Sequence, residues 1–208
     1  MKPLRPIETV YKGYRFRSRL EARWAVFFDA LDVAWDYETE GFDLGGGLRY
    51  LPDFWLPKES CFIEVKPFRE PEEAEIEKCR ALAEYHPVFM LMGVPERPAF
   101  SFDGEELLAT GAAAFCFPKI IGGHAQEVFP YWDGRVPRMY FWHERLVDPG
   151  GFVLWPVPSN EVIDVESDGK LVCVDSVIAN LKSMHTPRLL HAYDAARRAR
   201  FEFGENGA

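Results

Sequence analysis

Two short apolar segments, Tyr50-Leu-Pro-Asp53 and Cys61-Phe-Ile-Glu64-Val-Lys66, decide the predicted fold of this chain. Each is typical of a β-strand, and the residues between them have the composition of a turn, so the pair predicts a hairpin. That pairing would bring Asp53 beside Glu64. Side chains alternate along a strand, which places Glu64 and Lys66 on the same face, about 6–7 Å apart. Two carboxylates and an ammonium on one sheet face are costly unless a function uses them, and a divalent cation is the obvious user.

A helix is predicted to begin at Ser18, ahead of the hairpin. Apolar residues recur at helical spacing between Leu20 and Leu31 and form one wide apolar face. Ser18 and Glu21 fit a capping box, in which the serine caps the helix and the glutamate reaches back to the serine amide. Glu21 therefore has two interpretations that do not exclude each other: it caps its own helix, or it serves the acidic hairpin as a further ligand or proton acceptor.

The remaining pattern predicts an α/β protein. Over the first 95 residues the pattern predicts a short hairpin (8–17), a helix (18–31) and three meandering strands (33–44, 48–56 and 61–68). A second helix (71–85) and a buried strand (87–92), parallel to an earlier one, should follow. Glycines 45–47 are expected at a hairpin tip. Further strands are predicted over 113–117, 139–142, 152–155 and 171–174, and further helices over 105–110, 175–184 and 187–203, the last capped by Thr186.

Composition is that of a globular protein, with 48% hydrophobic and 27% charged residues among 208. Neither a signal peptide nor an apolar stretch long enough for a membrane is visible, and the four scattered cysteines suit a reducing compartment, so we expect a cytoplasmic protein. The net charge of −9 argues against loose affinity for nucleic acid. Basic residues nevertheless cluster near both ends of the chain, and such local patches can hold a phosphate backbone along one face.

The acidic hairpin has the donors for a hard cation. Asp53, Glu64 and the main-chain carbonyl of Val65 would supply three oxygens, which suits Mg²⁺ together with water and substrate phosphate. Lys66 could position a water molecule or stabilise charge that develops at phosphorus. The simpler alternative is a surface Glu–Lys pair on a solvated face, which contributes little. The apolar residues that flank both acids favour central strands and therefore a functional site.

The spacing of these residues has a counterpart in a known family. Pro52-Asp53, ten further residues and then Glu64-Val65-Lys66 resemble the signature of the PD-(D/E)XK nuclease superfamily, the restriction-endonuclease-like proteins. Ser18-Arg-Leu-Glu21-Ala-Arg resembles motif I of that superfamily. The chain is also similar here to the catalytic domains of transposase endonuclease subunits and to small phage and bacterial nucleases. The resemblance covers about residues 10–95.

The resemblance implies a fold and a set of roles. It implies a restriction-endonuclease-like core over 1–95, a central mixed sheet flanked by helices, followed by a C-terminal α+β extension over 96–208 that is separate or part of the same domain. Asp53 and Glu64 would bind Mg²⁺ or Mn²⁺ with the Val65 carbonyl, Lys66 would be the catalytic lysine, and Glu21 the auxiliary acid and a further candidate ligand. Four arginines would contact DNA phosphates near the cut: Arg15, Arg17, Arg19 and Arg23.

Two classes of function follow. The first is a metal-dependent DNA endonuclease of a prokaryotic or phage-infected cell, in which metal-activated water hydrolyses a phosphodiester; a narrower form is a structure-selective nuclease such as a junction resolvase. The second is a DNA- or protein-binding module that keeps the fold without catalysis. Many nucleases of this fold act as dimers, so the resemblance leaves a homodimer open, and no membrane partner is expected.

Overall fold

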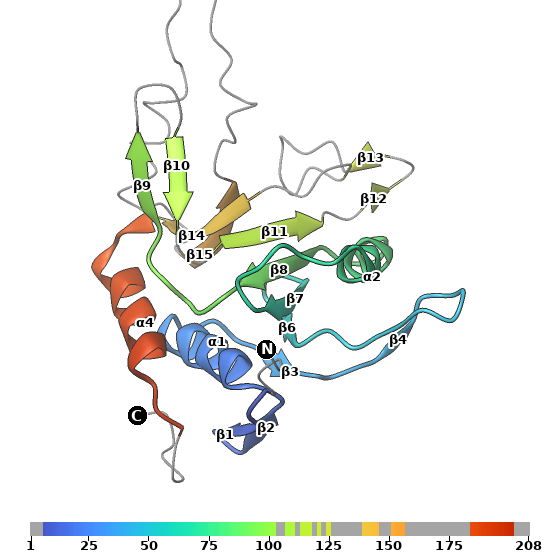
Figure 1. Ribbon diagram of the computed structural model, residues 1–208, viewed down its shortest axis with the longest axis horizontal. Coiled ribbons are helices and arrows are strands. Elements are labelled where there is room, and N and C mark those ends of the chain that lie inside the picture. Colours follow the sequence, from blue (N-terminus) through green and yellow to red (C-terminus); the bar gives the residue numbers. More distant parts are fainter. Residues whose placement is uncertain are drawn as a thin grey trace, which may run out of the picture.

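The structure is a computed structural model, and it describes residues 6–102, 107–110, 113–117, 120–121, 124–125, 139–145, 151–156 and 184–201 (Figure 1). The protein is α/β, as predicted, with a mixed sheet of seven strands and three helices in these described ranges. The helices are α1 (Arg19–Ala30), α2 (Glu73–Ala83) and α4 (Pro187–Arg198). Within the same ranges, none of the helices combines the length and the apolarity that crossing a bilayer requires.

The central sheet joins strands from both halves of the chain. Its strand order is β15-β14-β11-β8-β7-β6-β3, and among these described strands only β7 and β8 pair in parallel. Helix α2 carries the chain from β7 to β8, as a parallel pair requires, so the predicted parallel strand is confirmed. The strands are β3 (Asp36–Tyr37), β6 (Phe54–Leu56), β7 (Cys61–Lys66), β8 (Val88–Met92), β11 (Ala113–Phe117), β14 (Met139–Arg145) and β15 (Gly151–Pro156).

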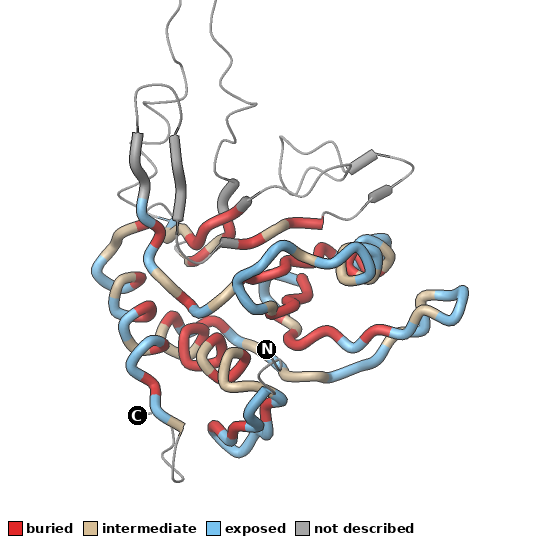
Figure 2. Tube along the Cα trace, viewed as in Figure 1, coloured by how far each residue is buried: buried red, intermediate tan, exposed pale blue. Residues whose placement is uncertain are grey.

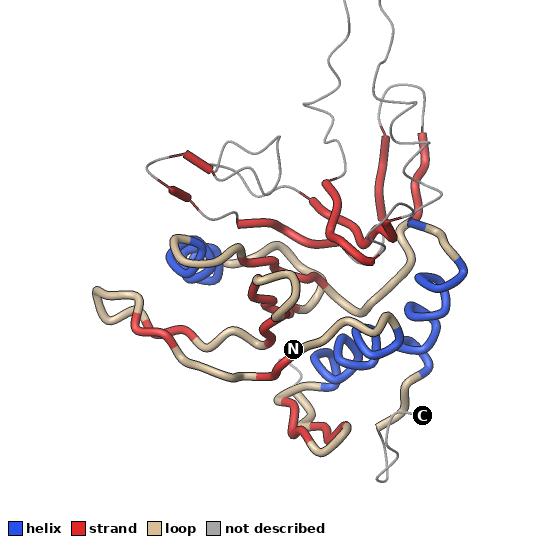
Figure 3. The backbone as a smooth tube through the Cα atoms, turned by 180° about the vertical axis from the view of Figure 1, so that it is seen from behind, coloured by secondary structure: helices blue, strands red, loops and turns tan. Residues whose placement is uncertain are grey.

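Different helices cover the two faces of the sheet. Ile63 and Leu91 pack in one core cluster with residues of α1 and α4. Phe62 and Met90, one position earlier in each strand, pack in a second cluster with residues of α2. Successive side chains of a strand point to opposite faces, so α1 and α4 lie on one face and α2 on the other. Figures 1 and 3 show α1 and α4 side by side, away from α2.

Helix α1 begins where the sequence predicts it. Ser18 is the N-cap, with an extended backbone and a hydroxyl that accepts a hydrogen bond from the Glu21 amide at 3.2 Å. Trp24, Phe27 and Phe28 are fully buried on its inner face. Burial of each phenylalanine stabilises the fold by about 1.5–3 kcal/mol. The predicted hairpin before the helix is also present, as β1 (Thr9–Tyr11) and β2 (Tyr14–Phe16).

A second hairpin, formed by β4 (Phe42–Asp43) and β5 (Arg49–Tyr50), projects from the body of the protein (Figure 1). Its tip is the predicted glycine turn: Gly45, Gly46 and Gly47 have φ values of 86°, 59° and 84°, which side-chain-bearing residues rarely adopt. Figure 2 shows this hairpin mainly exposed or partly buried, whereas buried residues gather in α1 and the central strands.

Two predicted strands are divided. The segment 33–44 contains β3 and β4 rather than one strand, because Glu38 has φ of 46° and a left-handed residue ends a pleated strand. The segment 48–56 contains β5 and β6. Between them lies Pro52, which has no amide proton for a ladder. The strand predicted over 61–68 and the helix over 71–85 are confirmed with shorter bounds.

The helix predicted over 105–110 is wrong for the residues that are described. Residues 107–110 form β10 (Leu107–Thr110), which pairs antiparallel with β9 (Ala99–Phe102). Partner pairing here overrides the helical propensity of a short Leu- and Ala-containing run. Another small pair, β12 (Ile120–Ile121) and β13 (His124–Ala125), was not anticipated.

Predictions for the later part of the chain are otherwise confirmed where it is described. Strands β11, β14 and β15 contain the segments predicted over 113–117, 139–142 and 152–155. Helix α4 begins at Pro187 after the N-cap Thr186, as predicted, and ends at Arg198 rather than at 203. The strand predicted over 171–174 and, apart from Met184, the helix over 175–184 lie outside the described residues.

Candidate functional site

The predicted hairpin is present and brings its two acids together. Strands β6 and β7 pair antiparallel with Phe54 opposite Ile63, and one further step of this register places Asp53 opposite Glu64. Both acids are buried, with 4% of Asp53 and 7% of Glu64 exposed. Asp53 Oδ2 accepts a hydrogen bond from the Val65 amide at 2.7 Å, which fixes the carboxylate against β7. Free carboxylates are rarely buried to this extent without a partner or a role.

Lys66 lies on the same face of β7 as Glu64, as the strand alternation predicts. Its ammonium forms an ion pair with Glu64 Oε1 and lies 3.7 Å from Glu75 Oε1 on α2. The Lys66 side chain keeps 21% of its surface exposed, so it lies between the buried acids and solvent. A substrate could therefore reach the Lys66 ammonium from solvent.

The main chain of β7 supplies a further oxygen on the acidic side. The Gly93 amide donates to the Lys66 carbonyl at 2.7 Å, on the side of β8. Successive carbonyls of a strand point to opposite edges, so the Val65 carbonyl points toward β6, where Asp53 lies. The Val65 carbonyl therefore lies at the same edge of β7 as Asp53, directly after Glu64 in the strand.

Glu21 approaches this edge from α1. Its Oε1 accepts from the Ser18 hydroxyl at 2.6 Å, and its Oε2 accepts from the Tyr37 hydroxyl at 2.6 Å and the Arg17 amide at 3.1 Å. Only half of the predicted capping box is therefore formed: Ser18 caps the helix, but the glutamate binds the Arg17 amide instead of the Ser18 amide. Glu21 is 8% exposed, so this carboxylate too is buried.

The electrostatics of the site centre on Asp53. Burial, and then the negative charges of Glu64 and Glu21, raise the pKa of Asp53 well above its usual value. The Val65 amide and the Lys66 ammonium oppose that shift but do not cancel it. For Lys66, burial lowers the pKa, but Glu64, Asp53 and Glu75 together outweigh it, so the pKa of this lysine is raised. The acids repel one another, and the lysine stays positively charged among them.

Three residues of the site were not predicted. The Tyr50 hydroxyl donates to Glu64 Oε2 at 2.9 Å, and burial first, then Cys79 and Glu64, raise the pKa of this tyrosine well above its usual value. Tyr37 orients Glu21, and Glu75 approaches Lys66. Tyr50 begins the strand segment Tyr50-Leu-Pro-Asp53, three residues before Asp53, so its position in the sequence could have indicated a place in the site. No sequence signal pointed to Glu75, because its approach to Lys66 depends on how helix α2 packs on the sheet.

The four arginines predicted to contact DNA have different neighbours in the structure. Arg17 is part of the acidic site, since its guanidinium donates to Asp53 Oδ1 at 3.1 Å and pairs with Glu38. Arg15 lies on the N-terminal hairpin, 3.6 Å from Glu8. Arg19 and Arg23 line a separate pocket between α1 and the end of α4. The structure thus gives the four arginines three different surroundings, and their contact with DNA stays a prediction.

The donors suit a hard divalent cation in their chemistry. They are carboxylate and carbonyl oxygens, and the raised pKa of Asp53 reflects a crowding of negative charge that a cation would relieve. Across the described residues, however, no three His, Cys, Asp or Glu side chains are gathered closely enough to form a metal-binding group. Lys66, Arg17 and Tyr50 instead hold the individual carboxylates.

The residues at the end of this hairpin thus combine buried acids, a lysine reachable from solvent and two orienting tyrosines. Such an arrangement can bind a cation, hold a phosphate oxygen beside an ammonium and accept a proton. Comparison of the chain with protein-family models, with curated protein sequences and with solved structures finds no match.

Proposed function

We propose that this protein is a Mg²⁺- or Mn²⁺-dependent DNA endonuclease of the PD-(D/E)XK kind. The observation that carries the proposal is the meeting of Asp53, Glu64 and Lys66 at the end of the β6–β7 hairpin, with Glu21 close enough to raise the pKa of Asp53. These are the residues that the family resemblance assigns to the nuclease site.

Burial of these charges is the strongest support. Three carboxylates in a region of low solvent access weaken the fold unless the protein uses them, and strongly shifted pKa values concentrate at functional sites. A solvated Glu–Lys pair, the simpler alternative, would leave both side chains exposed, whereas Glu64 is 7% exposed. The geometry therefore favours a functional site over a surface ion pair.

The fold is consistent with the same proposal. The chain runs α1, β3, β6, β7, α2 and β8, which is the expected order of helix, strands, helix and strand. The central sheet is mixed and has helices on both faces, which the resemblance to restriction-endonuclease-like proteins also implies. The site lies on the β6–β7 hairpin of that sheet.

Each side chain has a role in this proposal. Asp53 and Glu64 would hold the cation with the Val65 carbonyl, and Glu21 would complete the acidic set. When bound, such an ion polarises a phosphoryl oxygen and makes bound water more acidic. Lys66, kept protonated by its acidic neighbours, would place its positive charge beside the phosphate, where negative charge grows during the reaction.

The proposed reaction is a hydrolysis without change of oxidation state. A water oxygen forms a new bond to phosphorus while the bond from phosphorus to one sugar oxygen breaks. The water loses a proton to a carboxylate of the site, and the departing sugar oxygen takes up a proton. The products are one DNA end with a phosphate monoester and one with a hydroxyl.

A plasmid-nicking assay with Mg²⁺ tests the proposal. Wild type should convert supercoiled plasmid to the nicked or linear form, and Lys66→Ala should slow this by about 10²–10³-fold, the usual loss when one charge-stabilising group is removed. Lys58→Ala is the matched control, because Lys58 is exposed in the turn between β6 and β7. Equal inactivity of wild type and Lys66→Ala on linear, branched and single-stranded DNA would overturn the enzyme assignment.

Thermal melts with Mn²⁺ separate catalysis from a binding module that lacks the metal site. Wild type should gain about 2.7 kcal/mol of stability when the ion is present at 100 times its dissociation constant. Asp53→Asn should lose this gain. A wild type whose melting temperature does not respond to Mn²⁺ would favour the non-catalytic alternative.

A further inference from the structure

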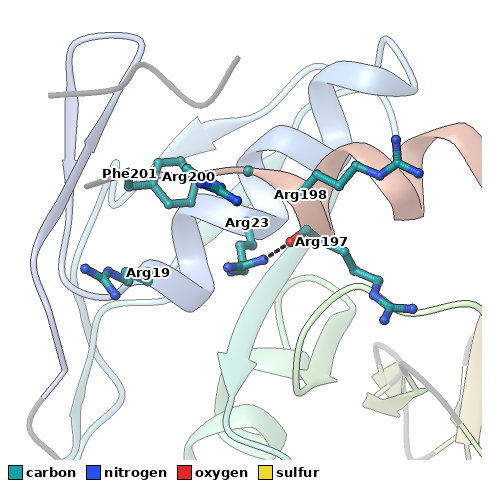
Figure 4. Close-up of a pocket in the computed structure, with 7 residues that line it drawn as sticks. Arg19, Arg23, Arg197, Arg198, Arg200 and Phe201 are labelled. Atoms are coloured by element: carbon teal, nitrogen blue, oxygen red, sulfur yellow. Dashed lines mark hydrogen bonds between the residues drawn. The ribbon is translucent and has the colours of Figure 1, made fainter. Parts of the chain in front are cut away.

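A pocket of about 560 Å³ lies between the first turns of α1 and the end of α4 (Figure 4). Residues from the two ends of the described chain therefore form it together. Its lining residues are Arg19, Arg23, Arg197, Arg198, Ala199, Arg200 and Phe201.

The pocket is strongly basic. Five of its seven lining residues are arginines and none is acidic, although the whole chain has a net charge of −9. Burial, and then the neighbouring Arg19, lower the pKa of Arg23, so the guanidinium groups are close enough to disfavour one another. Like charges held together in this way favour the binding of an anion.

Arg23 has a structural task in this pocket. Its guanidinium donates to the carbonyls of Ala196 and Arg197 at 2.9 and 2.7 Å, and so ties α1 to the last turn of α4. Those carbonyls lie at the negative end of the helix, which a cation stabilises. Arg23 therefore fixes the two walls of the pocket relative to each other.

The pocket arginines at and just beyond the end of α4 are weakly engaged. Arg197 lies 3.5 Å from Glu96, and Arg198 lies 3.5 Å from Asp194, with more than half of each arginine side chain exposed. Exposed pairs of this kind contribute little and exchange readily. Arg200 is exposed and makes no ion pair with any other residue in the described part of the chain.

The pocket and the acidic site lie on different sides of the same helix. Arg19 and Arg23 are four residues apart and share one face of α1, whereas Glu21 is two residues from each and lies on the opposite face. A helix is about 10 Å across, so the pocket is separated from Glu21 by little more than one helix diameter. Neighbouring phosphates along a DNA strand could span this distance.

We propose that this pocket binds backbone phosphates of DNA that flank the phosphate to be cut. Guanidinium groups bind phosphate oxygens in pairs, which suits several arginines on two facing walls. The inference rests on the proposed nuclease function for its choice of ligand, but not on catalysis by Asp53, Glu64 or Lys66. Arg197, Arg198 and Arg200 would join Arg19 as phosphate contacts, although they are far from Glu21 in the sequence.

Binding of a labelled DNA duplex to the full chain in EDTA tests the inference without cleavage. The affinity should fall with salt, and Arg197→Ala/Arg200→Ala should make the slope of log Kd against log salt shallower by about 1.8, or 0.9 for each lost phosphate contact. Affinity should drop on the order of tenfold or more at 0.1 M salt. Lys58→Ala/Arg80→Ala, which removes the same charge from exposed positions far along the chain, should change both values much less.

Each outcome of this binding experiment supports or overturns the assignment of the pocket to DNA. Unchanged slope and affinity in the pocket variant, with intact folding by circular dichroism and normal DNA binding by wild type, overturn the pocket but leave the nuclease proposal. In that case the single substitution Arg200→Glu should also leave the DNA affinity and its salt dependence unchanged. Equal losses in both double variants would mean a general charge effect and overturn the pocket as well.

A second arm distinguishes DNA from a free anion. Melting temperature is measured with inorganic phosphate at millimolar concentration, for wild type and the pocket variant. If phosphate stabilises only wild type while DNA binding is equal in both, the pocket takes a small free anion and the DNA assignment is overturned. Lys66→Ala should slow nicking about 10²–10³-fold but weaken DNA binding in EDTA by no more than the loss of one phosphate contact, which separates catalysis from the pocket.

Discussion

The hydroxyl of Tyr50 donates a hydrogen bond to Glu64 Oε2 at 2.9 Å, with both residues 7% exposed. Burial raises the pKa of Tyr50 well above its usual value, so the hydroxyl keeps its proton and remains a donor. Lys66 holds the other oxygen of the same carboxylate. Glu64 is thus oriented from two directions, by a neutral donor inside the fold and by a cation near its surface.

Tyr50→Phe should therefore destabilise the protein. The buried carboxylate would lose one donor with no water to replace it, a cost of about 1–3 kcal/mol. For a chain of this size each 1 kcal/mol corresponds to about 2–4 °C in melting temperature. Tyr37→Phe is the matched comparison and should cost less, because Glu21 keeps donors from Ser18 and Arg17. A Tyr50→Phe variant that melts with wild type would contradict this account of Glu64.

Asp53→Asn should stabilise the metal-free protein at neutral pH. The folded pKa of Asp53 lies above its unfolded value, so the folded state keeps a proton that the unfolded chain has already lost. Stability that is present below the unfolded pKa is then lost as pH rises through the folded pKa. Asparagine does not ionise and avoids this loss.

The measurement is melting temperature in EDTA for wild type and Asp53→Asn between pH 4.5 and 8. The difference between the two proteins should grow as pH rises and shrink as pH falls, because acid protonates Asp53 in wild type. Glu38→Gln is a useful comparison, since it removes a carboxylate that also pairs with Arg17 but lies outside the acidic pair. A difference that is constant with pH would exclude Asp53 as the group responsible.

Lys66 and Glu64 should be energetically coupled. Lys66→Met leaves Glu64 buried without its counter-charge, and Glu64→Gln leaves the ammonium without its main partner, so each single change should cost about 2–3 kcal/mol. The double variant removes both charges and should cost less than the sum, with a coupling energy of about 1–3 kcal/mol. Stability is measured by urea unfolding at pH 7.

The pH at which these variants are compared follows from the direction in which the pKa of Lys66 is shifted. Its folded pKa is raised, so the stability it contributes is fully present below the unfolded pKa and is lost only as pH rises through the higher folded value. At pH 7 the whole effect should be visible. If the double variant loses as much stability as the two single variants together, the ion pair contributes nothing beyond its separate side chains.

The sequence predicted the part of the site that a strand pattern encodes. Alternation places Glu64 and Lys66 on one face, and a hairpin of the right length brings Asp53 to Glu64, so these contacts depend on local rules alone. Glu75 and the arginines of α4 could not be predicted in this way. Their positions depend on how α2 and α4 pack on opposite faces of the sheet, which is decided by tertiary contacts.

The errors have the same origin. Residues 33–44 carry alternating aromatic residues, but Glu38 adopts a left-handed backbone and its amide donates to the Asp53 carbonyl at 2.9 Å. One residue thus ends β3 and fixes the backbone beside the site. Residues 107–110 form a strand because β9 is available as a partner, a fact that their own composition does not contain.

Glu21 allows the sharpest separation of structure from function. Ser18→Ala removes the N-cap hydroxyl and one donor to Glu21, and should cost about 1 kcal/mol of stability while much of the nicking activity remains. Glu21→Gln keeps the size of the side chain and relieves repulsion at Asp53, so its stability should stay within about 1 kcal/mol of wild type. Its nicking activity should nevertheless fall at least about tenfold, as for loss of an acid that assists the reaction. If Glu21 only shaped its helix, activity in the two variants would follow their melting temperatures.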